Sequence, residues 1–189
     1  MGECQAAEYY NAACKEVSAM DVYESPYLPL YQAAADMIGP NDRVIDLGSG
    51  TGRFARILFD RNHPLVHYLG LDFSDVNLGI ARRYNPGFAF VKWDLNDFQK
   101  LPLIEPLDVF VVLEVLEHLD DDLKLLKAIP KDKDVILSVP DYDGPAHVRF
   151  FENEAAVRNR YDALIHFFEI TAIPIKSSRI FLGNGFRKG

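Results

Sequence analysis

The sequence is poor in cysteine, with only Cys4 and Cys14 among its 189 residues. No second Cys or His pair stands nearby to complete a zinc site, so a cysteine-based structural metal centre is not expected. The first residues carry neither a basic start nor an apolar run, which are the marks of a secretory signal. These absences predict a cytoplasmic protein with two reduced thiols.

Long apolar runs and basic runs are also missing. The longest apolar run, residues 109–113, is stopped by Glu114 and is far too short to span a bilayer. Lys and Arg total 20 against 28 Asp and Glu, and no basic run exceeds two residues. This balance disfavours nucleic acid and anionic membranes as main partners. A hydrophobic content of 49% favours a folded chain, and the length suits one domain.

The order of expected elements indicates an α/β protein. Short apolar segments alternate with segments of helical periodicity between residues 43 and 139, and this alternation predicts a parallel sheet covered on both faces. The tail predicts a hairpin, and therefore an antiparallel strand near one edge of the sheet. The expected strands are 43–47, 67–71, 88–91, 108–113, 134–139, 164–175 and 179–186, and the expected helices are 30–38, 50–60, 74–84, 117–129 and 153–160.

A glycine-rich turn follows the first expected strand. It reads Asp46-Leu47-Gly48-Ser49-Gly50-Thr51-Gly52-Arg53. In open α/β sheets, ligands bind beyond the carboxyl ends of the strands, and glycines let the backbone approach them closely. The dinucleotide fingerprint requires its third glycine at position 53, where this chain has arginine. A nicotinamide-dependent oxidoreductase is therefore the weakest functional hypothesis.

This turn resembles the first motif of the class I S-adenosylmethionine-dependent methyltransferases, an acidic residue followed after one position by Gly-x-Gly-x-Gly. The resemblance spans about residues 40–150 and implies a Rossmann-like three-layer α/β/α core with a mostly parallel seven-stranded sheet. It implies a core domain at residues 40–189, preceded by an N-terminal helical lid segment at residues 1–39. The implied cofactor is S-adenosylmethionine, and the implied cofactor-binding residues are Asp46, Gly48, Ser49, Gly50, Gly52, Asp72, Phe73, Asp94, Leu95 and Glu114.

The resemblance assigns roles to the acidic residues. Asp72 ends the second strand, where the family places a carboxylate on the ribose hydroxyls, and Ser74 is better placed to cap the next helix. Asp94 follows the third strand, where the family often places an acid on the adenine amino group, but Asp97 competes for that role. The Asp46 side chain and a carbonyl near Gly48 could accept hydrogen bonds from the cofactor ammonium.

The segment from Glu114 to Leu119 resembles the fourth motif of the small-molecule branch that includes ubiquinone-type O-methyltransferases. His118 and His147 are the candidate catalytic residues, as proton acceptors with near-neutral pKa. Glu117 is expected to open a helix, where the dipole favours a carboxylate. Together, Glu117, His118 and His147 could suggest a metal site, but nothing in their spacing demands one, and no metal ligand is assigned.

Residues around the methyl acceptor are predicted from topology. The acceptor pocket is expected to lie over the cofactor sulfur, walled by residues 23–31, 117–118 and 147–149. Arg149 could hold an anionic group of the acceptor, or it could pair with the acidic residues 120–122, which are expected to form a solvated first helical turn. The pairing with residues 120–122 is preferred. The tyrosines that could form a lid, or simply pack the N-terminal helix, are Tyr9, Tyr10, Tyr23, Tyr27 and Tyr31.

The predicted function is methyl transfer from S-adenosylmethionine to a small-molecule acceptor by in-line displacement. A different class of protein stays open at this point, because the glycine motif reports cofactor binding only. That alternative is a non-catalytic partner or sensor protein that binds the cofactor.

Overall fold

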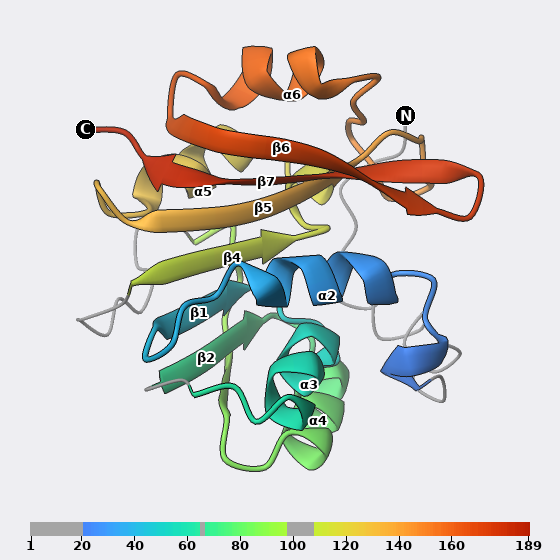
Figure 1. Ribbon diagram of the computed structural model, residues 1–189, viewed down its shortest axis with the longest axis vertical. Helices are drawn as coiled ribbons and strands as arrows, with labels where there is room; N and C mark the ends of the chain where they lie inside the picture. The colour runs from blue at the N-terminus through green and yellow to red at the C-terminus, as the bar shows by residue number, and fades with distance from the viewer. Residues whose placement is uncertain (1–20, 65–66, 98–107) are drawn as a thin grey trace.

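The computed structural model describes residues 21–64, 67–97 and 108–189. These residues form one seven-stranded sheet with strand order β3-β2-β1-β4-β5-β7-β6 (Figure 1). β7 pairs antiparallel with β5 and with β6, while β1 to β5 pair in parallel. The predicted mixed sheet with its antiparallel hairpin strand is confirmed. The strands are β1 (Arg43–Leu47), β2 (His67–Asp72), β3 (Ala89–Lys92), β4 (Val109–Leu113), β5 (Asp134–Pro140), β6 (Ile165–Ile175) and β7 (Ser178–Arg187).

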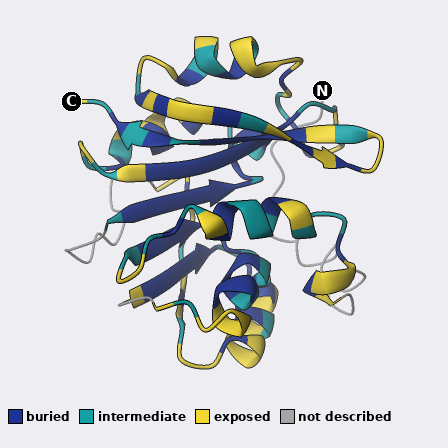
Figure 2. Cartoon of the chain, viewed as in Figure 1, coloured by how far each residue is buried: buried dark blue, intermediate teal, exposed yellow. Residues whose placement is uncertain are grey.

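Helices cover both faces of the sheet and make the predicted three layers. α2 (Leu28–Asp36), α3 (Arg53–Asp60) and α4 (Asp75–Tyr84) pack on one face, and α5 (Asp122–Ala128) and α6 (Glu154–Tyr161) on the other. β1 shows the alternation behind this division, because Val44 belongs to the core under α2–α4 and Ile45 to the core under α5 and α6. Figure 2 shows the central strands buried and the outer helices exposed on their solvent sides.

The strand order places the ligand crevice. β1 lies between β2 and β4, so the chain leaves β1 toward one edge of the sheet and later crosses to the other edge. A crevice opens where strand order reverses, beyond the carboxyl ends of these strands. The turns after β1, β2, β3 and β4 therefore meet at one end of the molecule. Within the described residues, no helix is both long enough and apolar enough to cross a membrane.

The helix predicted over residues 117–129 is wrong in its first half. The structure has a short 3-10 helix η3 (Leu116–His118), and α5 begins only at Asp122. Asp122, expected in a solvated turn, is 1% exposed and accepts hydrogen bonds from Arg160 and from the Tyr161 hydroxyl. A buried carboxylate needs such partners, and they come from α6, which lies 38 residues away in the chain.

Other predicted boundaries shift by a few residues for local reasons. α3 begins at Arg53 and not at Gly50, because Gly52 adopts the left-handed conformation with φ of 76°. α2 begins at Leu28, because Pro29 is tolerated in the first turn of a helix. Residues 1–20 of the predicted lid segment, with Cys4, Cys14, Tyr9 and Tyr10, lie outside the described residues. The division into a lid and a core at residue 40 stays a prediction.

Candidate functional site

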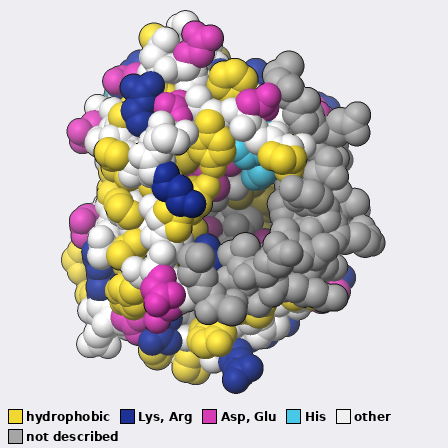
Figure 3. Space-filling model, turned by 90° about the vertical axis from the view of Figure 1, so that its right-hand side faces the viewer, with side chains coloured by type: hydrophobic (Ala, Val, Ile, Leu, Met, Phe, Trp, Pro, Cys, Tyr) yellow, Lys and Arg dark blue, Asp and Glu magenta, His cyan; other side chains and the backbone are white. Residues whose placement is uncertain are grey.

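A cleft opens at the carboxyl ends of β1, β2, β3 and β4. Figure 3 looks onto this side of the molecule and shows a hollow with histidine side chains beside it. Seven of the ten residues predicted to bind the cofactor contribute to the lining. The lining residues are Gly48, Gly50, Asp72, Phe73, Asn77, Asp94, Leu95, Asn96, Glu114, Val115, His118 and Leu119.

The glycine turn serves the cleft at one position and the fold at another. Gly50 has a φ of 53°, and a Cβ placed there would meet nothing within 4 Å, so the backbone borders open space. A ligand can therefore approach the main chain at Gly50. Gly52 lies outside the lining, and a Cβ there would lie 2.6 Å from the Asn85 side chain and 3.0 Å from that of Ala81. It allows α3 to pack closely against α4.

Asp72 is held in the cleft by three hydrogen bonds. One carboxylate oxygen accepts from the backbone N–H of Gly50 at 3.0 Å. The other accepts from the Ser74 N–H at 2.8 Å and from the Asn77 side-chain amide at 3.2 Å. Burial raises the pKa of Asp72, and these hydrogen bonds act in the opposite direction. The result is a positioned acceptor on the cleft wall, suited to a pair of hydroxyl groups.

The structure separates the two acids that follow β3. Asp94 lines the cleft together with Leu95, whereas Asp97 lies outside the lining. Asp94 accepts hydrogen bonds at 2.9 Å from both the backbone and the side chain of Asn96, so a local turn fixes its carboxylate. Asp94 is therefore the better placed of the two for an adenine amino group.

Glu114 provides a third acid, on the wall of the cleft that follows β4. It has a φ of 56°, uncommon for a residue with a side chain. Its backbone N–H donates to the Ser138 hydroxyl at 2.9 Å, and that hydroxyl donates to the Glu114 carboxylate at 2.8 Å. Burial raises the pKa of Glu114 to about 7, against the lowering effect of the Ser138 hydrogen bond. A cationic ligand group beside it would favour the ionised form.

Two predicted cofactor ligands lie behind the cleft wall. Asp46 is 3% exposed, lies outside the lining, and accepts a 2.5 Å hydrogen bond from the Tyr68 hydroxyl. Burial raises the pKa of Asp46 to about 7. Ser49 is 8% exposed and also lies outside the lining. The structure therefore does not bring the Asp46 side chain to the position expected for an ammonium acceptor.

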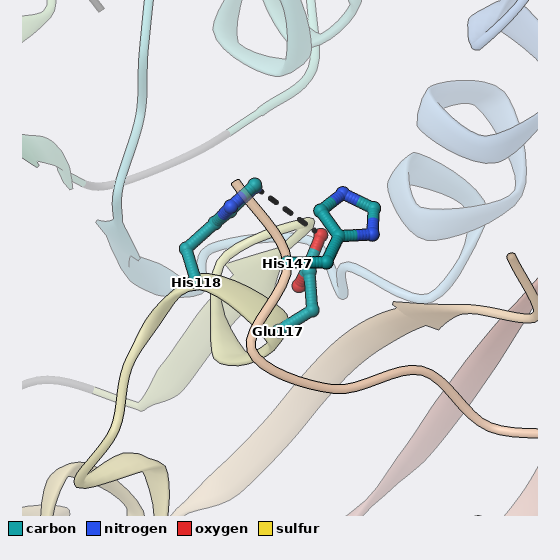
Figure 4. A group of neighbouring side chains, drawn as sticks. All are labelled: Glu117, His118 and His147. Carbon is teal, nitrogen blue, oxygen red and sulfur yellow. Dashed lines mark ion pairs between the residues drawn. The ribbon is translucent and has the colours of Figure 1, made fainter. Parts of the chain in front are cut away.

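Glu117, His118 and His147 come together beside the cleft, which His118 lines, although His147 follows His118 by 29 positions in the chain. Glu117 is 0% exposed, and its carboxylate lies 3.5 Å from the Nε2 atom of His118 (Figure 4). The two imidazole rings have their centres 4.9 Å apart. Burial lowers the pKa of His118, so its neutral form is favoured near pH 7. The cluster joins η3 to the segment before α6.

The predicted acceptor wall is only partly assembled as expected. Tyr27 and Tyr142 share a 2.6 Å hydrogen bond between their hydroxyls, which links α2 to the segment that carries His147. Tyr31 is hydrogen-bonded to Arg53 at the start of α3. Tyr23 was expected in this wall, but it is 49% exposed and donates to Asp60 at the far end of α3. Its exposed position in a separate short turn explains the difference.

Arg149 has the structural role that the sequence favoured. Its guanidinium donates to the backbone carbonyls of Leu116, Leu119 and Asp120 and lies 3.4 Å from the Asp122 carboxylate. It fixes the irregular chain between η3 and α5. Arg149 therefore does not present its charge to an acceptor anion.

Sequence reasoning missed four lining residues, Asn77, Asn96, Val115 and Leu119. Asn77 follows Ser74 by three residues, at the position where its backbone N–H bonds to the capping hydroxyl. That spacing could have indicated it, because the first turn of the helix after β2 faces the ligand crevice. Val115 and Leu119 flank η3. Leu119 was predicted to lie inside a continuous helix over residues 117–129, so its position in the cleft lining was hidden by the wrong element.

Comparison with known proteins agrees with this geometry. A family profile described as a methyltransferase domain matches residues 45–131. A trans-aconitate 2-methyltransferase of Acidovorax sp. (strain JS42) is 28% identical over 139 residues, which cover 70% of this chain and 53% of that protein. The enzyme of that name from Rhizobium etli is 34% identical over 116 residues, covering 58% and 43%. In sequence and in fold, the chain is similar to class I S-adenosylmethionine-dependent methyltransferases.

Solved structures show the fold of this methyltransferase family along almost the whole chain. A structure of the Haloferax volcanii Trm112 methyltransferase activator with a methyltransferase matches with a TM-score of 0.74 at 18% identity, covering 95% of this chain and 98% of that chain. The N-methyltransferase NodS of Bradyrhizobium japonicum, in complex with S-adenosylhomocysteine, matches with a TM-score of 0.68 at 15% identity. This match covers 95% of this chain and 98% of the NodS chain. The chain spans about half the length of the curated relatives it matches.

Proposed function

We propose that this chain transfers the methyl group of S-adenosylmethionine to a small-molecule acceptor. The observation that carries the proposal is the buried Asp72 carboxylate, which is fixed on the cleft wall by the Gly50 N–H at 3.0 Å. The Asp72 carboxylate, which can accept from hydroxyl groups, is thus held next to Gly50, where a ligand can approach the main chain because no Cβ is present. A nucleoside whose attached chain carries no phosphate fits it better than a dinucleotide, whose pyrophosphate would need the third glycine at Arg53.

Residues that follow β2 and β3 contact the adenosine part of the cofactor, and Glu114, which follows β4, contacts its amino-acid part. Asp72 accepts from the ribose hydroxyls, and Asp94 accepts from the adenine amino group. Glu114 takes the ammonium role that the sequence placed on Asp46. When bound, the cofactor supplies a methyl group made electrophilic by the sulfonium to which it is attached. The chain contributes positioning and exclusion of water, which can carry much of the rate enhancement of such a displacement.

The acceptor side holds a candidate proton acceptor. His118 lines the cleft, and its Nδ1 atom lies 2.9 Å from the Ala146 carbonyl oxygen. That contact favours the tautomer with the proton on Nδ1, which leaves Nε2 to accept a proton from an acceptor hydroxyl or amine. His147 lies behind it, with Nδ1 3.2 Å from the Tyr142 carbonyl oxygen.

Ligand-dependent melting tests cofactor binding. S-adenosylhomocysteine is expected to raise the melting temperature, because it binds the folded chain only, while NAD is expected to leave it unchanged. A variant with Asp72→Asn should lose most of the shift. Stabilisation by NAD and not by S-adenosylhomocysteine would overturn the proposal.

Turnover tests the catalytic part. A library of hydroxyl-, amine- and carboxylate-bearing metabolites, with trans-aconitate included, is screened for release of S-adenosylhomocysteine. Release with at least one small acceptor is expected. Tight binding of S-adenosylhomocysteine without turnover on any small molecule would favour the non-catalytic alternative, a partner or sensor protein.

A further inference from the structure

We propose that this chain forms a symmetric dimer through the sheet face over the first half of β6, with a second copy of the chain as the partner. The surface involved, called the β6 patch below, consists of His166, Phe168, Glu169, Asn184 and Phe186. It lies apart from the cleft that follows β1 to β4, so dimer formation is independent of the proposed function.

One half of β6 is covered on the side of α2 and the other half is not. Ile173 and Ile175 belong to the core under α2–α4. Alternation along the strand puts Thr171 and Glu169 on the same face, where the Thr171 hydroxyl donates to the Glu169 carboxylate at 3.2 Å. Phe168 is 63% exposed, the highest value of any described Phe, Tyr or Trp. Among the described elements, Figure 1 shows no helix in front of this half of β6.

Three aromatic rings gather on this uncovered part of the sheet. The ring centre of His166 lies 5.8 Å from that of Phe168 and 4.9 Å from that of Phe186, and the two phenylalanine rings are 5.7 Å apart. Because the rings already support one another, little side-chain freedom is lost when a partner binds. Contiguous exposed apolar surface marks interaction sites, and aromatic residues are enriched at the centre of protein interfaces.

A hollow beside Phe168 is the complement of its projecting ring. The hollow has a volume of about 150 Å³, and its apolar walls include Met37, Val109, Ile136 and Phe168. A cavity of about 150 Å³ holds one benzene-sized group. In a two-fold interface the same patch serves on both sides, so a surface with a projecting ring and a hollow of ring size can pair with itself. This match in size identifies a second copy of the chain as the occupant.

The free edge of β6 is less suited to pairing than the face. β6 ends the described sheet and pairs with β7 alone. The register shifts between Phe167 and Glu169, as at a β-bulge, and Pro174 has no backbone N–H to donate. Bulges and prolines prevent a second strand from adding to a sheet edge. Association is therefore expected face to face and not by extension of the sheet.

Charges on the β6 patch select the direction of the second copy. His166 and Glu169 are both exposed and lie on either side of Phe168 in the strand. If the two β6 strands cross antiparallel about a two-fold axis beside Phe168, His166 faces the partner's Glu169, and this contact occurs twice. Parallel strands would instead bring the two Glu169 carboxylates together. Charge complementarity therefore favours the antiparallel arrangement.

The β6 patch and the cleft lie at opposite ends of the strands. Val109 and Asp134, the first residues of β4 and β5, line the hollow, whereas Glu114, which follows the last residue of β4, lines the cleft. Both clefts of the dimer therefore stay open. The affinity for S-adenosylhomocysteine is expected to be equal in the monomer and the dimer.

Sedimentation equilibrium of the full chain, from about 1 to about 500 µM, tests the dimer. A reversible monomer–dimer equilibrium is expected, because a patch of this size suits an interface below about 1,200 Å² in total. Phe168→Ala should weaken the dimer at least about tenfold, as the loss of an aromatic anchor does. Phe59→Ala on α3 is the matched control, because that ring is 38% exposed, and it should leave the dimer unchanged.

Substitutions of the charged pair test the direction of the strands. His166→Lys should tighten the dimer and Glu169→Lys should weaken it, each by up to about fivefold, because both contacts are exposed ion pairs. Exchanging the charges, with His166→Glu and Glu169→Lys in one chain, should restore the affinity. Weaker association of the His166→Lys chain would overturn the antiparallel arrangement, since that result is expected when like residues face each other.

A chain that stays monomeric at every concentration would overturn the proposal, as would equal dimerisation by Phe168→Ala and Phe59→Ala. Thermal melting identifies a variant that fails to fold. Hydrogen exchange of the unmodified chain at low and high concentration then decides without any substitution, with slower exchange expected in residues 165–170 on dimerisation. Slower exchange only in other segments would place the interface elsewhere and overturn the proposal. Dimer formation without S-adenosylhomocysteine binding would overturn the proposed function and leave the dimer standing.

Discussion

Asp72 combines the binding role proposed for it with a structural one. Its two oxygens accept from Gly50, Ser74 and Asn77, so the same carboxylate closes the glycine turn and starts α4. This arrangement was not visible in the sequence, which indicated only an acid at the end of a strand. Any substitution there should affect ligand affinity and local stability together.

Replacing Asp72 with Asn should weaken S-adenosylhomocysteine binding by about tenfold to a hundredfold, because a hydrogen bond to a charged group contributes about 1.5–3 kcal/mol. Isothermal titration calorimetry measures the change. Asp75→Asn is the matched control, since that side chain is 71% exposed and pairs with Lys92 outside the cleft. An Asp72→Asn chain that is folded and binds with unchanged affinity would contradict the ribose assignment.

Asp94 and Asp97 provide a paired comparison three residues apart. Asp94→Asn should weaken S-adenosylhomocysteine binding by roughly tenfold or less, because one exposed hydrogen bond contributes about 0.5–1.5 kcal/mol. Asp97→Asn should leave the affinity unchanged, since this residue is outside the cleft lining. The same calorimetric titration applies. A larger loss in Asp97→Asn would reverse the assignment.

The contact between α5 and α6 depends on one buried acid. Asp122 accepts two 2.7 Å hydrogen bonds from Arg160 and a 2.8 Å bond from the Tyr161 hydroxyl. These bonds hold the start of α5 against the end of α6 and, through Arg149, the carbonyls that follow η3. The segment that carries Glu117 and His118 is therefore positioned by a helix far along the chain.

Asp122→Ala should lower the free energy of unfolding by about 3–5 kcal/mol, because it leaves buried polar partners without their acceptor. Urea denaturation measures this change. Asp120→Ala, two residues earlier and exposed, should change it by less than about 0.5 kcal/mol. Similar effects of the two substitutions would show that the buried network contributes little.

The folded chain as a whole carries several carboxyl groups whose pKa values are raised by burial. Asp46 and Glu114 have pKa values of about 7, and those of Asp72 and Glu117 are also raised. In the unfolded chain an Asp ionises near pH 3.9. Between that pH and about 7 these groups bind more protons in the folded chain than in the unfolded one, so their contribution to stability falls as the pH rises.

For Asp46 the decrease approaches about 1.4 kcal/mol per pH unit and sums to about 2 kcal/mol between pH 5 and pH 7, where the folded group is half ionised. Asp46→Asn should remove this part of the slope, because an amide oxygen can still accept from the Tyr68 hydroxyl but does not titrate. Urea denaturation of both proteins at the two pH values measures it. Equal slopes would mean that Asp46 titrates as an exposed carboxyl does.

Local features of the chain were readable from the sequence. The alternation of strands and helices follows from periodicity, and the place of the glycine turn from the rule that parallel strands end at one edge. The choice of Asp72, Asp94 and Glu114 as cofactor-binding residues came from the resemblance to the methyltransferase motifs. Each of these inferences joins residues that are neighbours in the chain or that follow successive strands. The three-layer sheet and most of the predicted residues that line the cleft were accessible to sequence reasoning for that reason.

Long-range packing decided the rest. The Tyr68 hydroxyl donates a hydrogen bond to the Asp46 carboxylate, and residues of α6 donate to the buried Asp122. The segment before α6 places His147 beside Glu117. None of these contacts leaves a periodic signal, because each depends on which side chains meet when distant elements are pressed onto the sheet. The sequence by itself determined where a cofactor-binding cleft would form. Only the tertiary structure decided which acids are buried beside it and that a carboxylate and two imidazoles share one space.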